Sequence, residues 1–293
     1  MMGGMHTTPP GAASRPARTA LDLLRCPLCG AELSRTGSAL ACARRHTYDI
    51  ARQGYVGLLT GGRRAANADT AAMVEAREAF LRTGHYGPLA AALAGLAGPL
   101  CPPGGAVLDA GAGTGYYLAA VLDALPDAVG LGLDTSKFAL RRAARAHARA
   151  AAATWDVWEP LPVATGSVDL VVNVFAPRNG PEFRRVLKPD GALLVVTPTP
   201  RHMAELRDAL GTLAVDEAKE ERLDRTLSAY FRREEARPLE YAVTLPPGEV
   251  ADLVSMGPTG HHLKAGEAAE RAARLGGAVG MTASFRLSVY RPL

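Results

Sequence analysis

Long hydrophobic runs are absent from this sequence. No stretch approaches the roughly 18 consecutive apolar residues that a membrane-spanning helix needs. The segment Met1–Arg18 is rich in Ala, Gly and Pro, and it lacks the apolar core of a secretory signal. These absences predict a chain that has no membrane partner and works in the cytoplasm.

Cysteine is scarce, with four residues among 293, and charge of neither sign dominates. Three of the cysteines lie between Cys26 and Cys42, whereas Cys101 stands alone. In a reducing compartment such a compact cluster indicates a metal site rather than disulfide bonds. The net charge of +4 fits an ordinary basic protein as well as one with a polyanionic partner, so charge alone assigns no function.

Composition and apolar periodicity divide the chain into three parts. Residues 1–20 are predicted to be a disordered tail, because small residues and paired prolines supply no hydrophobic period. Residues 21–62 form a compact, turn-rich unit, joined to the rest by the basic segment 61–64. Residues 63–293 are predicted to be one large α/β domain that opens with a helical linker over 65–100.

From Gly104 onward, short apolar runs alternate with helical patterns. Apolar runs of this length between helices are typical of a parallel sheet covered on both faces. The sequence therefore predicts a doubly wound, mostly parallel α/β sheet. The expected strands cover 106–110, 128–134, 168–175, 191–197, 239–245 and 282–290. The expected helices cover 116–124, 136–150, 181–187, 247–255 and 267–275.

A glycine-rich turn joins the first of these strands to its helix. The residues concerned are Asp109, Gly111, Gly113, Gly115 and Tyr116. Glycines at such a junction admit positive φ and let backbone amides approach a ligand beside the helix N-terminus. The spacing differs from the G-x-G-x-x-G of dinucleotide sites, because Tyr116 stands where the last glycine would be. An acid just before the loop suits the ammonium group of an amino-acid tail rather than a pyrophosphate, which favours S-adenosylmethionine over NAD.

Two further acids follow later strands and complete the predicted nucleoside site. Asp134 ends the second strand, where a carboxylate can hold the two ribose hydroxyls. Trp155-Asp156 ends the expected third strand, and Asp156 can there accept from an adenine amino group. The alternatives are a tight turn that binds nothing and, for Asp156, an acid that merely ends a strand.

The cysteine cluster has the spacing of a zinc site. Cys26 and Cys29 form a C-x-x-C knuckle, and Cys42 and His46 follow as C-x-x-x-H. Three thiolates and one imidazole make a closed tetrahedral set for one structural Zn²⁺, with no position left open for catalysis. The zinc ion would stabilise a unit that is too small to bury a hydrophobic core of its own. A redox C-x-x-C pair is the alternative interpretation.

Longer motifs carry a resemblance to known families. The segment Val107–Gly115 and the later Leu187–Gly191 resemble motifs of the class I Rossmann-like S-adenosylmethionine methyltransferases. The zinc ligands, followed by Tyr48–Val56, Met73–Leu81 and Gly84-His85-Tyr86, resemble the RlmA family of 23S ribosomal RNA guanine-N1 methyltransferases, including its tylosin-resistance branch. The similarity extends from Leu24 to the end of the chain.

The resemblance implies a function for each part. It implies methyl transfer to N1 of one of two neighbouring guanines in a hairpin loop of domain II of 23S rRNA. It also implies that the N-terminal zinc-binding module takes part in RNA recognition, and that the protein forms a homodimer. Arginines flanking the zinc ligands supply cations for phosphate, and Tyr48 and Tyr55 are candidates for stacking on bases.

The acceptor base is expected at the carboxyl ends of the strands. Asn173, Pro177 and Asn179 follow the fourth strand and are predicted to meet the target guanine. Asn173 is a candidate for reading the guanine edge, and an asparagine that bonds a loop backbone is the alternative. Secondary candidates for RNA contact are Arg77, Tyr86, His261 and His262.

Two other functions compete with rRNA methylation. One is a small-molecule methyltransferase whose zinc module serves only stability or dimerisation. The other is a non-catalytic protein that binds RNA or a partner. The intact glycine loop with Asp109 and Asp134 argues against the second, and the zinc module with its arginine-rich flank argues against the first.

Overall fold

A computed structural model describes residues 19–59, 68–206, 226–264 and 266–293. The expected disordered tail, up to residue 18, and the basic joint at 61–64 lie outside the described residues. At the tail's predicted boundary, Ala20–Leu23 already form a short 3-10 helix, η1. No helix in the described ranges is long and apolar enough to cross a bilayer.

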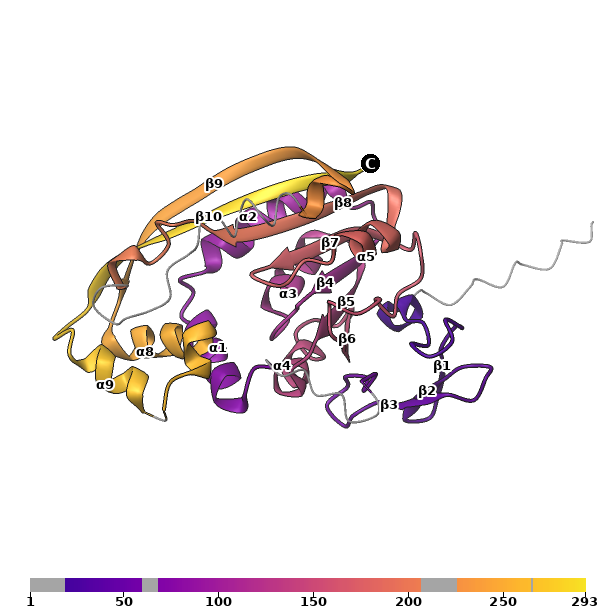
Figure 1. The fold of residues 1–293 in the computed structure, drawn as a ribbon, viewed down its shortest axis with the longest axis horizontal. Coiled ribbons are helices and arrows are strands. Elements are labelled where there is room, and N and C mark those ends of the chain that lie inside the picture. Colours follow the sequence, from indigo (N-terminus) through magenta and orange to yellow (C-terminus); the bar gives the residue numbers. More distant parts are fainter. Residues whose placement is uncertain (1–18, 60–67, 207–225, 265) are drawn as a thin grey trace, which may run out of the picture.

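The main sheet has seven strands in the order β6-β5-β4-β7-β8-β10-β9 (Figure 1). The five strands from β6 to β8 are parallel, whereas β10 runs antiparallel to both of its neighbours. This order confirms the predicted doubly wound, mostly parallel sheet. The strands are β4 Ala106–Ala110, β5 Val129–Asp134, β6 Ala150–Thr154, β7 Val168–Val174, β8 Leu187–Pro198, β9 Phe231–Leu245 and β10 Val279–Pro292.

The strand order reverses between β4 and β7, and this position places the functional site. From β4 the chain moves outward to β5 and β6, and it then returns to the other side of β4 to build β7 and β8. In open sheets of this kind the loops after the two central strands separate and leave a crevice at their carboxyl ends. The glycine loop after β4 and the loop after β7 both begin at this position.

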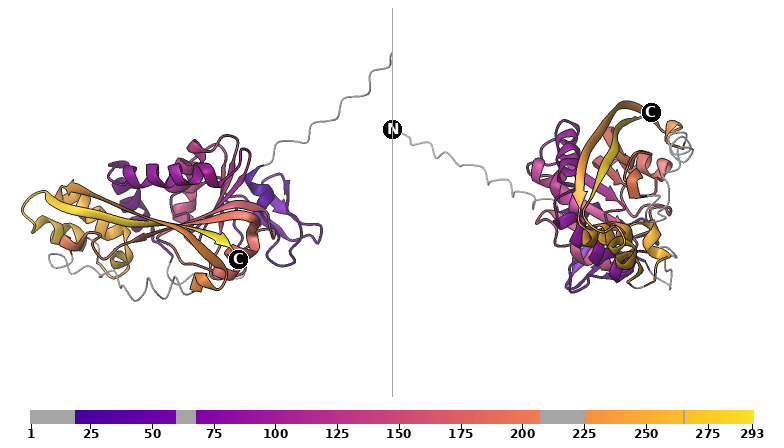
Figure 2. Two further views of the ribbon diagram at one scale, coloured as in Figure 1. Left: turned by 90° about the horizontal axis from the view of Figure 1, so that it is seen from above. Right: turned by 90° about the vertical axis from the view of Figure 1, so that its left-hand side faces the viewer.

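Helices cover the sheet and extend beyond it. They are α1 Ala71–Arg82, α2 Gly87–Ala97, α3 Tyr116–Ala124, α4 Lys137–Ala143, α5 Gly180–Val186, α8 Pro247–Met256 and α9 Glu267–Ala273, with 3-10 turns η2 Gly98–Leu100 and η3 Pro258–His261. Helix α1 packs against α8 from the far end of the chain. Figures 1 and 2 show α8 and α9 at one end of the molecule and the zinc module at the other.

The structure corrects two expected boundaries. The helix expected over 136–150 ends at Ala143, and Ala150 already pairs with Gly130 as the start of β6. Alanine suits helix locally, so pairing with β5 decides the state of this alanine run. Strand β9 begins at Phe231 rather than near Leu239, because it pairs with β10 along almost its whole length. Its exposed, charged residues are typical of an edge strand, so no apolar run in the sequence marks its first half.

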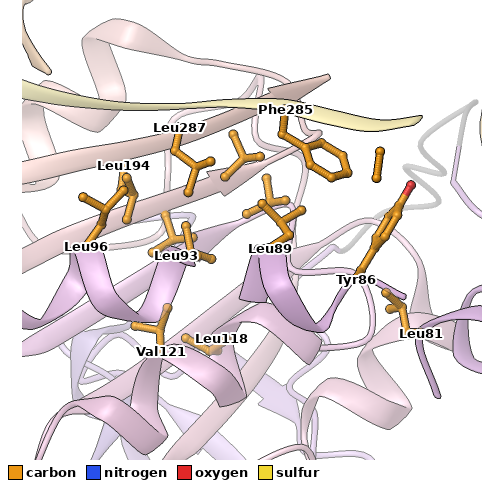
Figure 3. Close-up of a cluster of buried hydrophobic side chains, with 14 of the residues drawn as sticks. Leu81, Tyr86, Leu89, Leu93, Leu96, Leu118, Val121, Leu194, Phe285 and Leu287 are labelled. Carbon is orange, nitrogen blue, oxygen red and sulfur yellow. The ribbon is translucent and has the colours of Figure 1, made fainter. Parts of the chain in front are cut away.

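One hydrophobic cluster lies between α2, α3 and the sheet. Leucines of α2 meet Leu118 and Val121 of α3 on one side, and Leu194, Phe285 and Leu287 of the sheet on the other (Figure 3). A second cluster joins the zinc module to the α/β domain, through Leu23, Leu24, Val56, Leu58, Leu131 and Leu133. The module is therefore not an independent unit, because its apolar residues are buried in a shared core.

The zinc module also continues the sheet itself. Its own strands, β1 Ser34–Thr36, β2 Ala39–Ala41 and β3 Thr47–Asp49, form a small antiparallel sheet. Beyond them, Val56 makes a parallel bridge to Ala153 at the edge of β6, and Leu24 bridges to Val163. Backbone hydrogen bonds therefore add to the apolar contacts that orient the module.

Candidate active site and metal centre

The glycine loop forms the floor of the crevice after β4. Gly111, Gly113 and Gly115 have φ values of 91°, 53° and 79°, which favour glycine over any other residue. A Cβ at Gly111 would lie 2.3 Å from the Cβ of Ala176, so only glycine lets the loop after β7 come this close. The predicted strand–loop–helix arrangement is present, with α3 beginning at Tyr116.

Asp109, on β4 just before the glycine loop, is a buried carboxyl group with an unused oxygen. Only 2% of the residue is exposed, and its Oδ1 is buried without a hydrogen-bond partner among the described residues. Burial, together with the nearby Asp134 carboxylate, raises the pKa of Asp109 to about 8. A carboxyl in this state is suited to a ligand that brings a positive charge, such as the ammonium group of S-adenosylmethionine.

Asp134 shapes the loop around the same position. Its Oδ2 accepts from the Gly113 amide at 2.8 Å, and its Oδ1 accepts from the Ser136 amide at 2.8 Å. Each carboxylate oxygen can accept a second hydrogen bond. Asp134 therefore retains capacity for ribose hydroxyls, and that contact stays a prediction.

Asp156 lies in the loop that follows β6, two residues beyond Thr154, whereas the sequence predicted that it ends the strand. Its Oδ1 accepts from the Trp158 amide at 3.0 Å, which tightens the turn. The structure thus bears out a local role in the loop, and its contact with adenine remains a prediction. Asp109, Asp134 and Asp156 follow or end three neighbouring parallel strands, so the sheet order brings the three acids to one edge.

Asn173, on β7, ties the two central loops together. Its Nδ2 donates to the carbonyls of Ala110 at 2.9 Å and Pro177 at 2.8 Å. Two carbonyl partners fix which side-chain atom is the nitrogen, so the alternative of an asparagine that bonds loop backbone is confirmed for this amide. Its Oδ1 is buried and has no partner in the described part of the chain. Only the oxygen is therefore left to read a base.

Asn179 joins the loops after β6 and β7. Its Nδ2 donates to the carbonyls of Val157 at 2.9 Å and Trp158 at 3.2 Å, and its Oδ1 accepts from Glu182 as the N-cap of α5. The amide group is thus engaged within the protein. The structure shows a positioning role for Asn179, while contact of Asn179 or Pro177 with the base remains a prediction.

Helix α1 lies over the glycine loop. Arg77 pairs with Asp69, donates to the Met256 carbonyl at 2.9 Å, and lies 3.4 Å from where a Gly113 Cβ would stand. His261 lies 3.8 Å from the same Asp69 carboxylate. Arg77 was predicted as an RNA contact, but the structure places it at the cofactor loop. This placement depends on packing between α1 and α8, which no local pattern reveals.

Aromatic residues from distant parts of the chain form a cluster beside the site, which no local sequence pattern predicts. Tyr86 is buried and packs edge-on against Phe285, with ring centroids 5.3 Å apart (Figure 3). It therefore packs within the aromatic cluster, and its contact with RNA stays a prediction. His202 hydrogen-bonds Tyr86 and accepts from the Ser284 amide at Nδ1, so its proton lies on Nε2. Burial lowers the pKa of His202 to about 4, and the ring is neutral at physiological pH.

The metal ligands converge in the zinc module. Cys26 Sγ lies 3.4 Å and Cys42 Sγ lies 3.5 Å from His46 Nδ1, while Cys29 Sγ lies 3.8 Å from Cys42 Sγ. All four ligand atoms lie within 4.8 Å of one another. Bonds of about 2.3 Å to sulfur and 2.0 Å to nitrogen in a tetrahedron separate ligands by roughly 3.5–3.8 Å. The donor set and its spacing therefore fit one structural Zn²⁺.

Tyr48 contacts one of the four metal ligands. Its hydroxyl lies 3.2 Å from Cys26 Sγ, and only 2% of the residue is exposed. A phenol beside a thiolate ligand donates to the sulfur and orients it. The prediction that Tyr48 stacks on bases was therefore wrong, because the ring is buried against the metal site.

Comparison with known proteins completes this picture. The family described as "RlmA, N-terminal" matches residues 24–61, and the one described as "Methyltransferase domain" matches residues 107–191. The chain is 48% identical to "23S rRNA (guanine(748)-N(1))-methyltransferase" of Streptomyces fradiae, over 92% of this chain and 97% of that protein. It is 52% identical to a protein of Micromonospora griseorubida named for guanine-N1 methylation of 23S rRNA, over 93% and 98% of the two chains.

The chain belongs to the 23S rRNA (guanine-N1)-methyltransferase family. Membership confirms the resemblance based on the linker motifs. It also confirms an enzyme that uses S-adenosylmethionine and carries a structural zinc ion. For this methyltransferase, the unused Asp109 oxygen and the glycine-lined floor of the crevice fit the methyl donor.

Cofactor binding by the methyltransferase is expected to release a proton. Asp109 is protonated below a pKa of about 8, and a ligand ammonium favours its ionised form. Affinity for S-adenosylhomocysteine should therefore rise roughly tenfold between pH 6 and 7, as expected for one ionisation. Calorimetry at pH 7 in buffers of different ionisation enthalpy should report close to one proton released. A pH-independent affinity with no proton release would show that Asp109 does not face the ammonium.

Proposed function

We propose that this enzyme transfers a methyl group from S-adenosylmethionine to N1 of the 23S rRNA guanine named for its Streptomyces fradiae relative. The observation that carries the proposal is 48% identity over nearly the full length of both chains. The glycine loop, the acids near it and the Cys3His set all lie within the aligned length of the chain.

The proposed roles follow the geometry of the crevice. S-adenosylmethionine supplies an electrophilic methyl group when it is bound. Asp109 receives its ammonium, Asp134 its ribose and Asp156 its adenine. The Asn173–Asn179 loop orients the guanine, and alignment of N1 with the methyl group supplies much of the acceleration.

The zinc module is proposed to bind RNA phosphates. Its exposed arginines at the described positions include Arg35, Arg44, Arg45 and Arg52. Cations on a rigid module bind the backbone and position the RNA without reading its sequence. Because the module is packed on the sheet edge, such contacts would hold the RNA in a fixed place relative to the crevice.

Three further features complete the proposal, of which the homodimer and the resistance rest on the family resemblance and the location on the sequence composition. We propose a homodimer, a cytoplasmic location and protection of the ribosome against tylosin-type macrolides. Light scattering of the purified protein tests the first. Growth of a macrolide-sensitive host with and without the gene tests the last, and unchanged sensitivity would contradict it.

Primer extension tests the proposed reaction directly. Unmodified 23S rRNA incubated with the protein and labelled S-adenosylmethionine should acquire label and a reverse-transcription stop at that guanine, because N1 methylation blocks base pairing. Label that appears only in a small metabolite would support the small-molecule alternative. No transfer by folded, zinc-loaded protein would support a non-catalytic binding protein.

A further inference from the structure

Phe175 is an unusual residue at the carboxyl end of β7. Its φ of 54° lies in the left-handed region, which bulky side chains rarely occupy. It is also one of few large apolar side chains exposed in the described part of the chain, at 43%. A strained backbone that presents an aromatic ring to solvent persists only where the surrounding structure enforces it, and such positions cluster at ligand sites.

The surrounding contacts hold this ring in place. The Phe175 amide donates to the Val196 carbonyl at 3.2 Å. Its ring lies 5.6 Å from Phe285, 6.3 Å from Tyr117 and 6.4 Å from Tyr86, measured between centroids. The next residue, Ala176, sits against Gly111 of the cofactor loop. A rigid aromatic surface is thus built beside the position of the methyl donor.

Two residues beside Phe175, one in sequence and one in ring contact, carry unused polar atoms. Asn173 Oδ1, two residues before Phe175, and the hydroxyl of Tyr117 are both buried without a hydrogen-bond partner among the described residues. Buried polar atoms are normally satisfied, so orphans that gather around an exposed ring indicate a ligand with polar edges and an aromatic face. A nucleobase has both.

We infer that Phe175 is the surface on which the target guanine stacks, and that Asn173 Oδ1 accepts a hydrogen bond from its N2 amino group. The inference rests on the proposed function and names the residues that select its substrate. Both hydrogens of the Asn173 amide are engaged by backbone carbonyls, so the side chain cannot turn to offer a donor. It therefore presents only an acceptor, which matches the N2 amino donor of guanine and finds no corresponding donor at C2 of adenine.

Substitutions at Phe175 separate stacking from apolar packing. Phe175→Leu keeps an apolar side chain but removes the aromatic face, and Phe175→Tyr keeps the face. Base stacking on an aromatic ring contributes enough that Phe175→Leu should lower single-turnover methylation roughly 10- to 100-fold. Phe175→Tyr should stay within about threefold of wild type, a smaller change than loss of stacking would cause. The dissociation constant for S-adenosylhomocysteine should be unchanged in both variants.

A binding readout independent of activity completes the test. With 2-aminopurine in place of the target guanine, RNA bound to the Phe175→Leu variant should fluoresce more brightly than RNA bound to wild type, because stacking quenches the base. RNA with inosine at the target, which lacks the N2 amino group, should be methylated at least tenfold more slowly by wild type; this arm needs no variant that could misfold.

The outcomes distinguish this inference from the proposed function. If wild type forms no N1-methylguanine in 23S rRNA, the proposed function fails. If wild type forms it while Phe175→Leu and inosine RNA react at the normal rate, only the present inference is overturned. Weakened binding of S-adenosylhomocysteine by Phe175→Leu would also overturn it, because Phe175 would then support the methyl donor instead.

Discussion

Replacing Cys42 with serine is expected to release the zinc ion and destabilise the whole protein. Cys42 lies in contact with both Cys29 and His46, and three remaining ligands cannot close a tetrahedral set. A structural zinc ion contributes on the order of 10 kcal/mol to the folding of small modules at neutral pH. The three short strands of this module cannot offset such a loss.

The effect should spread beyond the module because its core is shared. Leu23, Leu24 and Val56 are fully buried against residues of the methyltransferase domain. When the module unfolds, these contacts open and apolar surface of the main sheet is exposed. Elemental analysis should find one zinc ion per wild-type chain and almost none in Cys42→Ser. Thermal unfolding should begin more than about 10 °C lower, because each 1 kcal/mol lost lowers the melting temperature by roughly 2–4 °C.

Cys101→Ser provides the matched control. Cys101 is a buried cysteine like Cys42, but it lies in the main core and outside the group of zinc ligands. Its replacement should leave the zinc content at one per chain. Full zinc content and wild-type melting in Cys42→Ser would contradict the assignment of this residue as a ligand.

Asp109→Asn is expected to raise the dissociation constant of the methyl donor and, at the same time, to make the protein more stable. An amide cannot supply the negative charge that the donor's ammonium needs in a buried site. Loss of one partner of a buried pair costs about 3 kcal/mol or more, roughly a hundredfold in the dissociation constant. Calorimetry with S-adenosylhomocysteine measures this loss directly.

The gain in stability follows from the raised pKa. An ordinary aspartic acid has a pKa of 3.8, whereas burial and Asp134 raise that of Asp109 to about 8 in the folded protein. Between these values the folded state binds a proton that the unfolded chain has released, so this group destabilises the wild type increasingly as pH rises from about 4 to 8. At pH 7 the cost is on the order of 4 kcal/mol, and Asp109→Asn removes it.

Thermal unfolding at pH 5 and pH 8 distinguishes this account from a simple loss of structure. Asp109→Asn should melt above wild type, and the difference should be larger at pH 8 than at pH 5. Asp123→Asn, at a largely exposed carboxylate, should change neither donor binding nor the melting difference. A variant that melts below wild type at pH 8 would show that Asp109 stabilises the fold.

Much of the site was predictable because its parts are local in the chain. The zinc ligands Cys26, Cys29, Cys42 and His46 span a short segment, and their spacing alone specifies the donor set. The glycine loop is likewise one turn between a strand and its helix, and the positive φ at Gly111 follows from that role. Apolar runs also predicted the sheet, since buried parallel strands need apolar residues on both faces.

Other features depend on contacts between distant segments and left no local signal. Ala150 forms a strand because β5 offers it a partner, although alanine suits a helix as well. Tyr48 is buried by the metal site rather than exposed to RNA, and Arg77 reaches the cofactor loop through the packing of α1 on α8. Phe175 is a plain aromatic residue in sequence, and only the fold turns its backbone left-handed and places it among three rings.

The sequence by itself therefore determined the chemistry that this chain carries: a donor loop, acids at strand ends and a zinc-binding set. The donor loop and the two halves of the zinc-binding set are each defined by residues a few positions apart, and the acids by their places at the ends of predicted strands. Only the tertiary structure decided which carboxyl group lies buried and unpaired, which amide oxygen stays free and which ring faces solvent. Burial and hydrogen-bond satisfaction depend on everything that packs around an atom, and here those neighbours come from all parts of the chain.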